Sequence, residues 1–427
     1  MQIIKSLLDT DLYTFTVQQL VFFKHTNLSV KYKFKWRNWK DMSLNISLKD
    51  FVGRLKEQLN AFCSLTFTEE ELSYLSSLPY FKKEYISYLR MFKPNRNYIK
   101  VSLDANNELQ VIITGPWLET IIFEVPVLAI ISQLYTEHST QADQKNLFKN
   151  GSQILKDKWD TIKSDTNIDS FRFSDFGTRR RASFDWHYSV LTQLLDNVGI
   201  HLTGTSNVYF AQKLGLTPVG TMSHQFLQAY QQTKGGNVID SQSRALQDWA
   251  DLYRGDLGIA LSDCLTFDFF LKNTFDKYFA KLYDGCRHDS GSPYVWADKL
   301  INHYLGLGIN PKTKTAVFSD GLDFRKAMNI HWSYGNKINC SFGIGTDLTN
   351  SCGLIAPQIV IKMVECDDKP VAKISDSEGK GMCEDASYEE HLRKIVTKHT
   401  AVPQMGHQSF ILGPTSTLLT NRINKEL

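Results

Sequence analysis

The sequence predicts an α/β protein in which an irregular α/β barrel is joined to an α+β lobe. From about residue 171 onward, short apolar or β-branched runs alternate with helix-like segments, and about eight such units recur. Strands that alternate with helices favour a parallel sheet, and about eight units favour a barrel. The 427 residues suffice for two or three lobes.

The first third of the chain has a different pattern, dense in aromatic residues and lysines. The run VKYKFKWRNW, residues 30–39, alternates polar and apolar residues with the period of a half-buried strand. Residues 101–115 are expected to form a hairpin around 105–107, and Thr68, followed by acidic residues, is expected to cap a helix. These elements predict the α+β lobe.

Three domains follow from these patterns. We expect an N-terminal α+β lobe over residues 1–135 and a barrel-like catalytic domain over residues 136–370. Residues 371–427 are expected to form a C-terminal helical tail, because the run SYEEHLRKIVTKH is charged and helical in character. We expect this tail to pack on the N-terminal lobe and to complete it.

Eight runs carry the expected strands of the barrel, and small or polar residues end each of them. The runs are RFSDFGTR, GIHLTGTSN, PVGTMSHQ, IALSDCLTFDFF, LYDGCRHDSG, TAVFSDGLD, INCSFGIGTD and PQIVIKMVEC. Since chemistry collects at the carboxyl ends of barrel strands, we expect these polar ends to form the functional site.

Composition and charge argue against several function classes. The formal charge of +3 is small for this length and gives no reason to expect a nucleic-acid partner. Seven cysteines without CxxC spacing favour a reducing compartment over a disulfide framework or a zinc site. Glu119, Glu124 and Pro126 interrupt the most apolar run, which makes it a poor membrane span. We expect a cytoplasmic protein that binds neither nucleic acid nor membrane.

Two glycine turns, FSDGLD at 318–323 and FGIGTD at 342–347, follow apolar runs late in the chain. Glycine lets backbone N–H groups approach an anion closely. The phosphate site of many barrels is built after the last two strands. The pair therefore indicates a phosphate site, although ordinary turns have the same composition.

The stretch YDGCRHDSGSP, residues 283–293, gathers ionisable groups at one strand end. Arg287 can hold an anion in a fork, and Asp289 can bind sugar hydroxyls or reach a metal through water. A solvated ion-pair loop is the alternative, and the density of ionisable groups favours a site.

The stretch DFGTRRRAS offers an aromatic ring and three arginines. Phe176 could stack on a flat ligand, and Arg179 could bind phosphate. For Arg180 and Arg181, a solvated basic turn is an equally good interpretation.

His224 lies in TPVGTMSHQF, at the point where a buried strand would surface. Its place among other polar strand ends makes a catalytic role as good an interpretation as a structural one. Nine further histidines, His187 among them but not His288, lack ligand spacing and are interpreted as structural or exposed. No Walker A, GxGxxG, HExxH or GxSxG motif occurs, so ATP would have to bind without a P-loop.

Together these stretches resemble the nicotinate phosphoribosyltransferase family. LLDTDLYTFT, FSDFGTRRRAS, LTGTSNVYFA, GTMSHQF, YDGCRHDSG, FSDGLD and FGIGTDLTN occur in the family's order over nearly the whole chain. The resemblance implies the barrel of type II phosphoribosyltransferases. It also implies an enzyme of NAD salvage that transfers phosphoribosyl from phosphoribosyl pyrophosphate (PRPP) to nicotinate, giving nicotinate mononucleotide and pyrophosphate. ATP is implied as co-substrate, and Mg²⁺ as a cofactor on the pyrophosphate.

The resemblance implies roles for individual residues as well. His224 corresponds to the residue that becomes a phosphohistidine, and a neutral imidazole can attack the γ-phosphate of ATP. Tyr13 is implied to cover one face of the pyridine ring of nicotinate from a neighbouring subunit, which implies a homodimer with shared sites. The other implied roles are stacking on the pyridine ring by Phe176, binding of phosphate or carboxylate by Arg179 and Arg287, binding of ribose hydroxyls by Asp289, and binding of the 5′-phosphate by Ser319, Asp320, Gly321, Gly343, Gly345 and Thr346.

Specificity for the base is expected to depend on Ser206, which together with Thr205 is expected to contact nicotinate. The related nicotinamide enzyme is similar overall but carries Asp at the position of Ser206. A carboxylate accepts from an amide and repels nicotinate, whereas serine can donate to a carboxylate. Nicotinate is therefore the expected substrate.

Other functions stay open at this point. The chain could be a nicotinamide phosphoribosyltransferase, which Ser206 argues against, or a barrel that binds phosphoribosyl ligands without turnover. A quinolinate-type enzyme would need a more basic pocket for a second carboxylate and no ATP, and Arg179 to Arg181 leave that possibility open.

Overall fold

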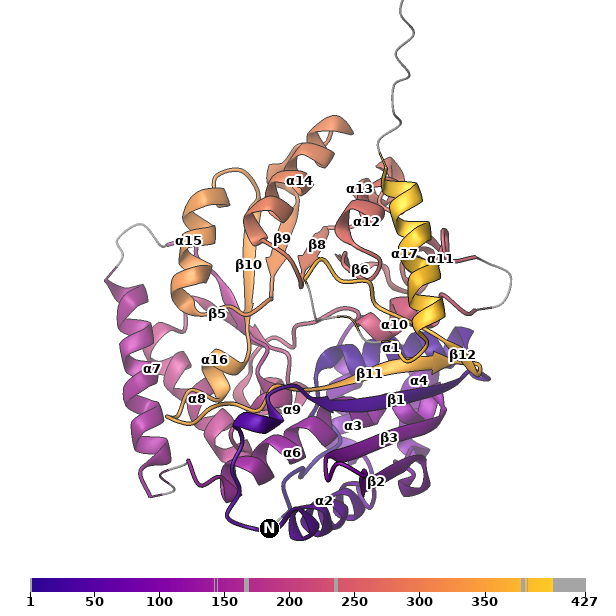
Figure 1. Cartoon of the computed structure of the whole chain (residues 1–427). Coiled ribbons are helices and arrows are strands. Elements are labelled where there is room, and N and C mark those ends of the chain that lie inside the picture. The colour runs from indigo at the N-terminus through magenta and orange to yellow at the C-terminus, as the bar shows by residue number, and fades with distance from the viewer. Residues whose placement is uncertain are drawn as a thin grey trace, which may run out of the picture.

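A computed structural model describes residues 2–141, 143, 145–164, 169–233, 237–377, 381 and 383–401. Two sheets organise them: a five-stranded antiparallel sheet in an N-terminal lobe and a six-stranded parallel sheet in the second domain. The predicted combination of an α/β domain with a separate α+β lobe is confirmed (Figure 1).

The N-terminal lobe is formed by the first nine helices and strands together with two strands from late in the chain. Its bounds are α1 Leu12–Lys24, β1 Ser29–Trp36, α2 Leu48–Phe62, α3 Glu69–Ser77, α4 Lys83–Met91, β2 Ile99–Leu103, β3 Leu109–Pro116, α5 Trp117–Thr120, α6 Glu124–His138, β11 Ile359–Cys366 and β12 Lys369–Pro370. The sheet order is β12-β11-β1-β3-β2.

Local sequence explains the elements of the lobe. Alternate residues of β1 are buried, as its alternating pattern predicts. The expected hairpin is β2–β3, and Asn107 at its turn has φ 61. Thr68 caps α3 in a complete capping box, because its hydroxyl accepts from Glu71 N while the Glu71 carboxylate accepts from Thr68 N.

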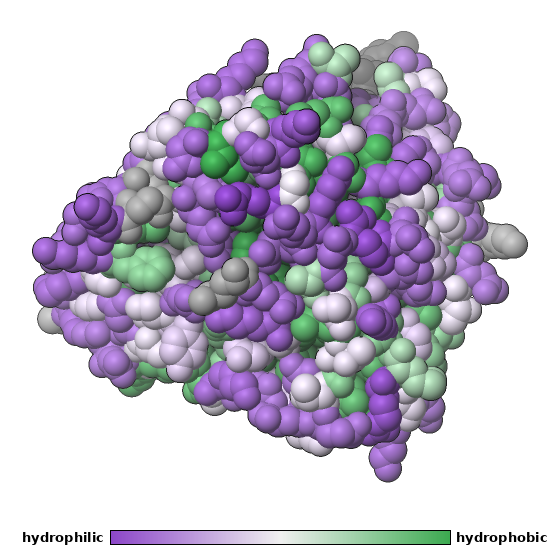
Figure 2. Space-filling view, turned by 90° about the horizontal axis from the view of Figure 1, so that it is seen from below, coloured by the Kyte–Doolittle hydropathy of each residue, from purple (hydrophilic) through white to green (hydrophobic). Residues whose placement is uncertain are grey.

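One helical run, Trp117–His138, is long and apolar enough to cross a membrane by length and composition. In the fold, 83% of its most apolar window is buried, so it forms the core of the lobe. Around that core, α2 turns Phe51, Leu55 and Leu59 inward at helical spacing. Hydrophilic residues cover most of the face of the molecule that is seen from below (Figure 2).

The second domain alternates strands and helices around the parallel sheet, whose order is β5-β4-β10-β9-β8-β7. Its bounds are α7 Leu147–Lys163, β4 Phe173–Asp175, α8 Phe184–Val198, β5 Leu202–Thr205, α9 Val208–Leu214, α10 His224–Ala229, α11 Ser241–Tyr253, β6 Arg254–Leu257, β7 Ile259–Leu261, α12 Phe267–Asn273, α13 Lys277–Leu282, β8 Gly285–His288, α14 Pro293–Gly306, β9 Thr315–Phe318, α15 Phe324–Tyr334, β10 Asn339–Ile344 and α16 Thr346–Thr349.

Within the described residues, five 3₁₀ turns complete the two domains: η1 Trp39–Asp41, η2 Arg96–Tyr98, η3 Ile121–Phe123, η4 Thr178–Arg180 and η5 Pro311–Thr313.

Six of the eight expected barrel runs form the strands of the parallel sheet. The run around residues 217–221 forms no regular strand but joins the two edge strands. Val219 N donates to Thr205 O (2.9 Å), and the Thr221 hydroxyl donates to Ile259 O (2.8 Å). This segment closes the irregular barrel.

The eighth run, β11, does not belong to the barrel, although residues 136–370 were expected to do so. It pairs with β1, from the far end of the chain (Figure 1). Its burial largely alternates between the two faces, which suits an antiparallel sheet with one covered face rather than a parallel strand buried on both faces.

The expected packing of the tail on the N-terminal lobe is wrong. Helix α17, Ala386–Thr400, packs instead on α12 of the barrel domain, where Leu392 and Val396 join Leu265 and Phe269 in a small separate core. The C-terminal contribution to the lobe is the β11–β12 pair. Residues 402–427 of the expected tail lie outside the described residues.

Candidate active site

The carboxyl ends of four parallel strands open onto one cavity of about 730 Å³. Phe176 follows β4, Asp289 follows β8, and the two glycine turns follow β9 and β10. The N-terminal lobe completes the wall through β11. The predicted meeting of polar strand ends at one site is thus what the fold produces.

The wall of this cavity carries a surplus of positive charge. Seven basic side chains and four carboxylates line it: Arg37, Arg179, Arg180, Arg287, Lys326, Lys362 and Lys373, and Asp289, Asp320, Asp323 and Asp347. Burial, with the charge of Lys373 second, lowers the pKa of Lys362 to about 8. Burial and Arg179 lower the pKa of Arg180 to about 10. Such a wall favours a polyanionic ligand.

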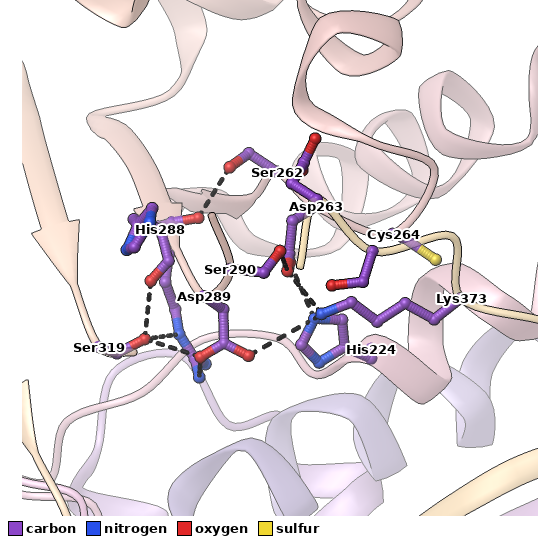
Figure 3. Close-up of polar contacts among 12 residues, drawn as sticks. His224, Ser262, Asp263, Cys264, His288, Asp289, Ser290, Ser319 and Lys373 are labelled. Carbon is purple, nitrogen blue, oxygen red and sulfur yellow. Dashed lines mark hydrogen bonds and ion pairs between the residues drawn. The ribbon is translucent and has the colours of Figure 1, made fainter. Parts of the chain in front are cut away.

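His224 begins α10 and lies in a cluster of charged groups beside the cavity (Figure 3). Its Nε2 lies 2.8 Å from Asp263 Oδ1, 2.9 Å from the Lys373 ammonium and 3.6 Å from Asp289 Oδ2. Asp263 also accepts from Lys373 and from Ser290 (2.6 Å). All three contacts fall on Nε2, and the second oxygen of Asp263 is committed to Lys373 and Ser290.

The charges of this cluster determine its protonation. Burial, followed by the charge of Lys373, lowers the pKa of His224 to about 4, so the imidazole is neutral at neutral pH. Burial opposes the ionisation of Asp263, but Lys373 and His224 outweigh it and hold the pKa of that carboxyl well below its usual range. The cluster therefore combines a neutral imidazole with an ionised carboxylate.

Arg287 and Asp289 are brought together, as expected. Arg287 Nη2 lies 3.0 Å from Asp289 Oδ1, and Arg287 Nε donates to the Ser319 hydroxyl at 2.8 Å. Ser319 is also 2.9 Å from Asp289 Oδ1 (Figure 3). Burial opposes ionisation of Asp289, but Arg287, together with His224 and Lys373, outweighs it and lowers the pKa of this carboxyl. This triad joins the ends of β8 and β9.

Of the two glycine turns, Asp320, Gly321, Gly345 and Thr346 line the cavity with Ser319. Gly343 does not. A Cβ on Gly343 would lie 2.4 Å from the ring of Phe176, so this glycine makes room for the ring. Arg287 lies on that same ring, 5.7 Å from its centroid. The predicted phosphate ligand Gly343 is therefore a spacer behind Phe176.

Two family models and several known proteins match this chain over most of its length. The model of the nicotinate phosphoribosyltransferase (NAPRTase) family matches residues 171–399, and that of the family's N-terminal domain matches residues 8–132. Nicotinate phosphoribosyltransferases of Xanthomonas euvesicatoria and Burkholderia ambifaria are 44% and 42% identical over 395 residues, covering 92% of this chain and 97% and 96% of theirs. The chain belongs to the nicotinate phosphoribosyltransferase family.

A solved structure agrees. The crystal structure of nicotinate phosphoribosyltransferase from Vibrio cholerae has a TM-score of 0.85 and 34% identity, and the match covers 92% of this chain and 93% of that one. The predicted enzyme class, a nicotinate phosphoribosyltransferase, is confirmed, and with it a place in NAD salvage. The nicotinamide, quinolinate and non-catalytic alternatives lose their support.

In this nicotinate phosphoribosyltransferase, Tyr13 lies beside the site of its own chain, whereas the resemblance implied that it reaches the site from a neighbouring subunit. Its ring lies under Arg179 at 5.6 Å, and it lines a small second cavity with His224. Burial raises the pKa of Tyr13 well above its usual range. The shared site expected for a homodimer is thus not required for this residue, and the homodimer stays a prediction.

The three consecutive arginines have three different environments. Arg179 lies 3.4 Å from Asp11 and 3.5 Å from Glu124 and lines both cavities. Arg180 donates to Ile359 O at the cavity wall. Arg181 is fully buried and makes a two-point ion pair with Asp9. The alternative of a solvated basic turn is wrong, most clearly for Arg181.

Thr205 and Ser206 are buried and do not line either of these two cavities. The Thr205 hydroxyl donates to Asp175 (2.6 Å), and the Ser206 hydroxyl donates to Asp11 (2.8 Å). Ser206 does donate to a carboxylate, as argued, but to one of the protein. Asp11 also faces Arg179, so Ser206 is linked to Arg179 through Asp11.

Sequence reasoning missed several charged residues of the site. Asp263 follows β7, so the strand-end rule that found Asp289 would have found it too. Lys362 is the one basic residue in the otherwise apolar first half of β11, and its charge there marks it in the sequence. Lys373 and Arg37 follow strands of the other sheet and reach the cavity only through the packing of the lobe on the barrel.

Proposed function

We propose that this enzyme couples ATP hydrolysis to the transfer of phosphoribosyl from PRPP to nicotinate, through a phosphohistidine at His224. Nicotinate mononucleotide and pyrophosphate are the proposed products. The observation that carries the proposal is the position of a neutral imidazole, held by Asp263, beside a cavity with a cationic wall and two glycine turns.

Phosphorylation is proposed to occur at Nδ1. Nε2 faces both the Asp263 carboxylate, which only accepts hydrogen bonds, and the Lys373 ammonium, which only donates them. We propose the tautomer in which Nε2 donates to Asp263, which leaves the lone pair of the neutral ring on Nδ1. Nδ1 attacks the γ-phosphorus of ATP, the bond to the β-phosphate oxygen breaks, and ADP leaves. Asp263 stabilises the positive charge that develops on the ring. Water later hydrolyses the phosphohistidine to inorganic phosphate and restores His224.

In the transfer step, the protein contributes mainly by positioning the two substrates and by stabilising the charges that develop in the transition state. The nicotinate nitrogen attacks C1′ of PRPP as the bond to pyrophosphate breaks. We propose that Ser319, Gly321 and Thr346 hold the 5′-phosphate and that Asp289 binds the ribose hydroxyls. Phe176 and Tyr13 are proposed to face the pyridine ring, and the cations of the wall, Arg179 and Arg287 among them, take the pyrophosphate.

Mg²⁺ is proposed to bind with the pyrophosphate. Mg²⁺ is usually held by one or two carboxylates together with substrate phosphates. Asp289 and Asp320 line the phosphate cavity and fit that use. Asp263 lies with His224 and Asp289 in a group of possible ligand atoms, but Lys373 and Ser290 already occupy it. The metal would neutralise charge on the leaving group.

The cellular setting is proposed from the same observations. All seven cysteines are free, five of them buried, which suits a reducing cytoplasm. We also propose a homodimer, but one in which each chain contains its own Tyr13, Phe176 and His224.

One assay with two readouts tests the proposal. Nicotinate, PRPP and Mg²⁺ are supplied with and without ATP, and nicotinate mononucleotide and inorganic phosphate are followed together. The proposal predicts that ATP raises product formation, that phosphate is released alongside, and that His224→Ala loses the ATP effect. Equal product without ATP and no phosphate release would return His224 to the structural histidines.

A further inference from the structure

Next to His224 on α10, Gln225 is buried at the point where three elements of the N-terminal lobe meet. Its carbonyl oxygen accepts from the Tyr32 hydroxyl of β1 (2.6 Å) and from the Trp117 indole of α5 (3.0 Å). Its amide nitrogen donates to Glu124 of α6 (2.9 Å). The indole only donates and the carboxylate only accepts, so the orientation of the amide is fixed.

Glu124 connects this amide to the substrate cavity. One carboxylate oxygen accepts from Gln225, and the other lies 3.5 Å from Arg179 Nη1. Arg179 in turn lies over Tyr13 and lines both cavities. A continuous path of polar contacts thus runs from the neighbour of His224 to the guanidinium that lines the cavity, and Glu124 and Gln225 are more than 90% buried along it.

We propose that Gln225 is a positioning residue that couples the state of His224 to Arg179. Phosphorylation adds about 1.5 to 2 negative charges at the first residue of α10. A shift of that helix turn moves Gln225, and through Glu124 it moves the guanidinium that faces the substrates. The proposal rests on the proposed phosphorylation of His224 and adds how the substrate cavity responds to it.

The alternative is that Gln225 only satisfies buried polar groups. A matched control is available in α1. Gln18 is also buried, accepts from a tyrosine hydroxyl (Tyr85, 2.7 Å) and donates to Leu118 O (2.8 Å), but it contacts neither Glu124 nor Arg179. Loss of Gln18 should therefore lower stability without changing how ATP use and transfer are linked.

The experiment measures phosphate released per nicotinate mononucleotide formed, together with KM for nicotinate and the thermal midpoint. Gln225→Glu places a carboxylate against Glu124, and Gln225→Met removes the hydrogen bonds without adding charge. Both should raise the phosphate-to-product ratio by about threefold or more, within the range of couplings measured in one polar network, and both should raise KM. Gln18→Met should leave the ratio unchanged.

The exchange variant Glu124→Gln with Gln225→Glu keeps each hydrogen bond, because a carboxylate at 225 accepts from Tyr32, Trp117 and the new amide. It should bring the ratio back toward that of the unmodified enzyme. The inference is overturned if the unmodified enzyme couples ATP to transfer and folded Gln225→Met keeps both its ratio and its KM. No ATP effect in the unmodified enzyme would instead overturn the proposed function, and the inference with it.

Discussion

In each of two histidine–aspartate pairs, the aspartate lies at the end of a barrel strand and the histidine in a helix, and the two pairs have nearly the same contact distance. His187 Nε2 lies 2.7 Å from Asp175, and His224 Nε2 lies 2.8 Å from Asp263. The first pair is fully buried, and Asp175 is further bonded to Thr205 and to the Gly177 amide. The second pair adjoins a cationic cavity and contacts Lys373. The surroundings, more than the pair itself, separate a structural role from a chemical one.

The largest expected effect follows from removing the histidine at the cavity. His224→Ala should reduce ATP-dependent phosphate release by about 10²-fold or more, since the proposed nucleophile is gone. Transfer without ATP should persist, because the groups that hold PRPP are untouched. Steady-state assays of both products check this. A variant that still releases phosphate at the normal rate would remove the distinction between the two pairs.

Removing the fully buried histidine, His187, should lower stability instead of changing ATP use. His187→Ala leaves Asp175 buried with one partner fewer, and the free energy of unfolding should fall by about 3 kcal/mol. Urea unfolding measures this value. The phosphate-to-product ratio of the folded variant should match that of the unmodified enzyme. A changed ratio with unchanged stability would reverse the roles given to the two pairs.

The pH dependence of the free energy of unfolding should reveal the lowered pKa of His224 in the second pair. The pKa of His224 is about 4 in the folded state against about 6.5 in the unfolded chain, so between these values only the unfolded state binds the proton. Stability should therefore fall as pH is lowered from 7 to about 4.5. This group should account for about 2 kcal/mol of the fall, the size expected for a shift of this kind. Parallel denaturation of His224→Gln should show a correspondingly smaller fall.

The neighbours Thr205 and Ser206 extend the comparison, because Thr205 contacts the buried His187–Asp175 pair and Ser206 contacts a residue beside the cavity. The Thr205 hydroxyl donates a hydrogen bond to Asp175 of the buried pair, and the Ser206 hydroxyl donates one to Asp11, which lies beside Arg179. Ser206→Asp puts a carboxylate against Asp11 and should lower kcat/KM for nicotinate at least tenfold, or ~1.4 kcal/mol. Thr205→Val should lower stability while the preference for nicotinate over nicotinamide is kept. An unchanged kcat/KM in Ser206→Asp would refute the role of Ser206.

Periodicity and strand-end chemistry predicted the class of fold and the side of the barrel where the site lies. They placed His224 and Asp289 together because parallel strands end at one edge. They could not predict that α17 packs on α12 or that Arg181 is buried against Asp9, since both depend on contacts between distant segments. Lys373 reaches His224 in the same way, by the path of the chain after β12.

The same limit applies to the two histidines. Sequence motifs singled out His224 and left His187 among the structural residues, but the motif gives no distance to an aspartate. Only the folded chain reveals that both histidines have one. For Gly343 the sequence suggested a role that the fold does not give it. Its turn has the composition of a phosphate site, but the Phe176 ring fills the space that a side chain at residue 343 would need.

The most direct test is to locate a labelled phosphate. The enzyme is incubated with ATP carrying radioactive γ-phosphate and quenched at alkaline pH, and the labelled peptide is identified. The account predicts one acid-labile phosphate per chain on the peptide that contains His224, and none in His224→Ala. Label on another residue, or no label while phosphate is still released with product, would contradict the claim that His224 is the chemical member of the two pairs.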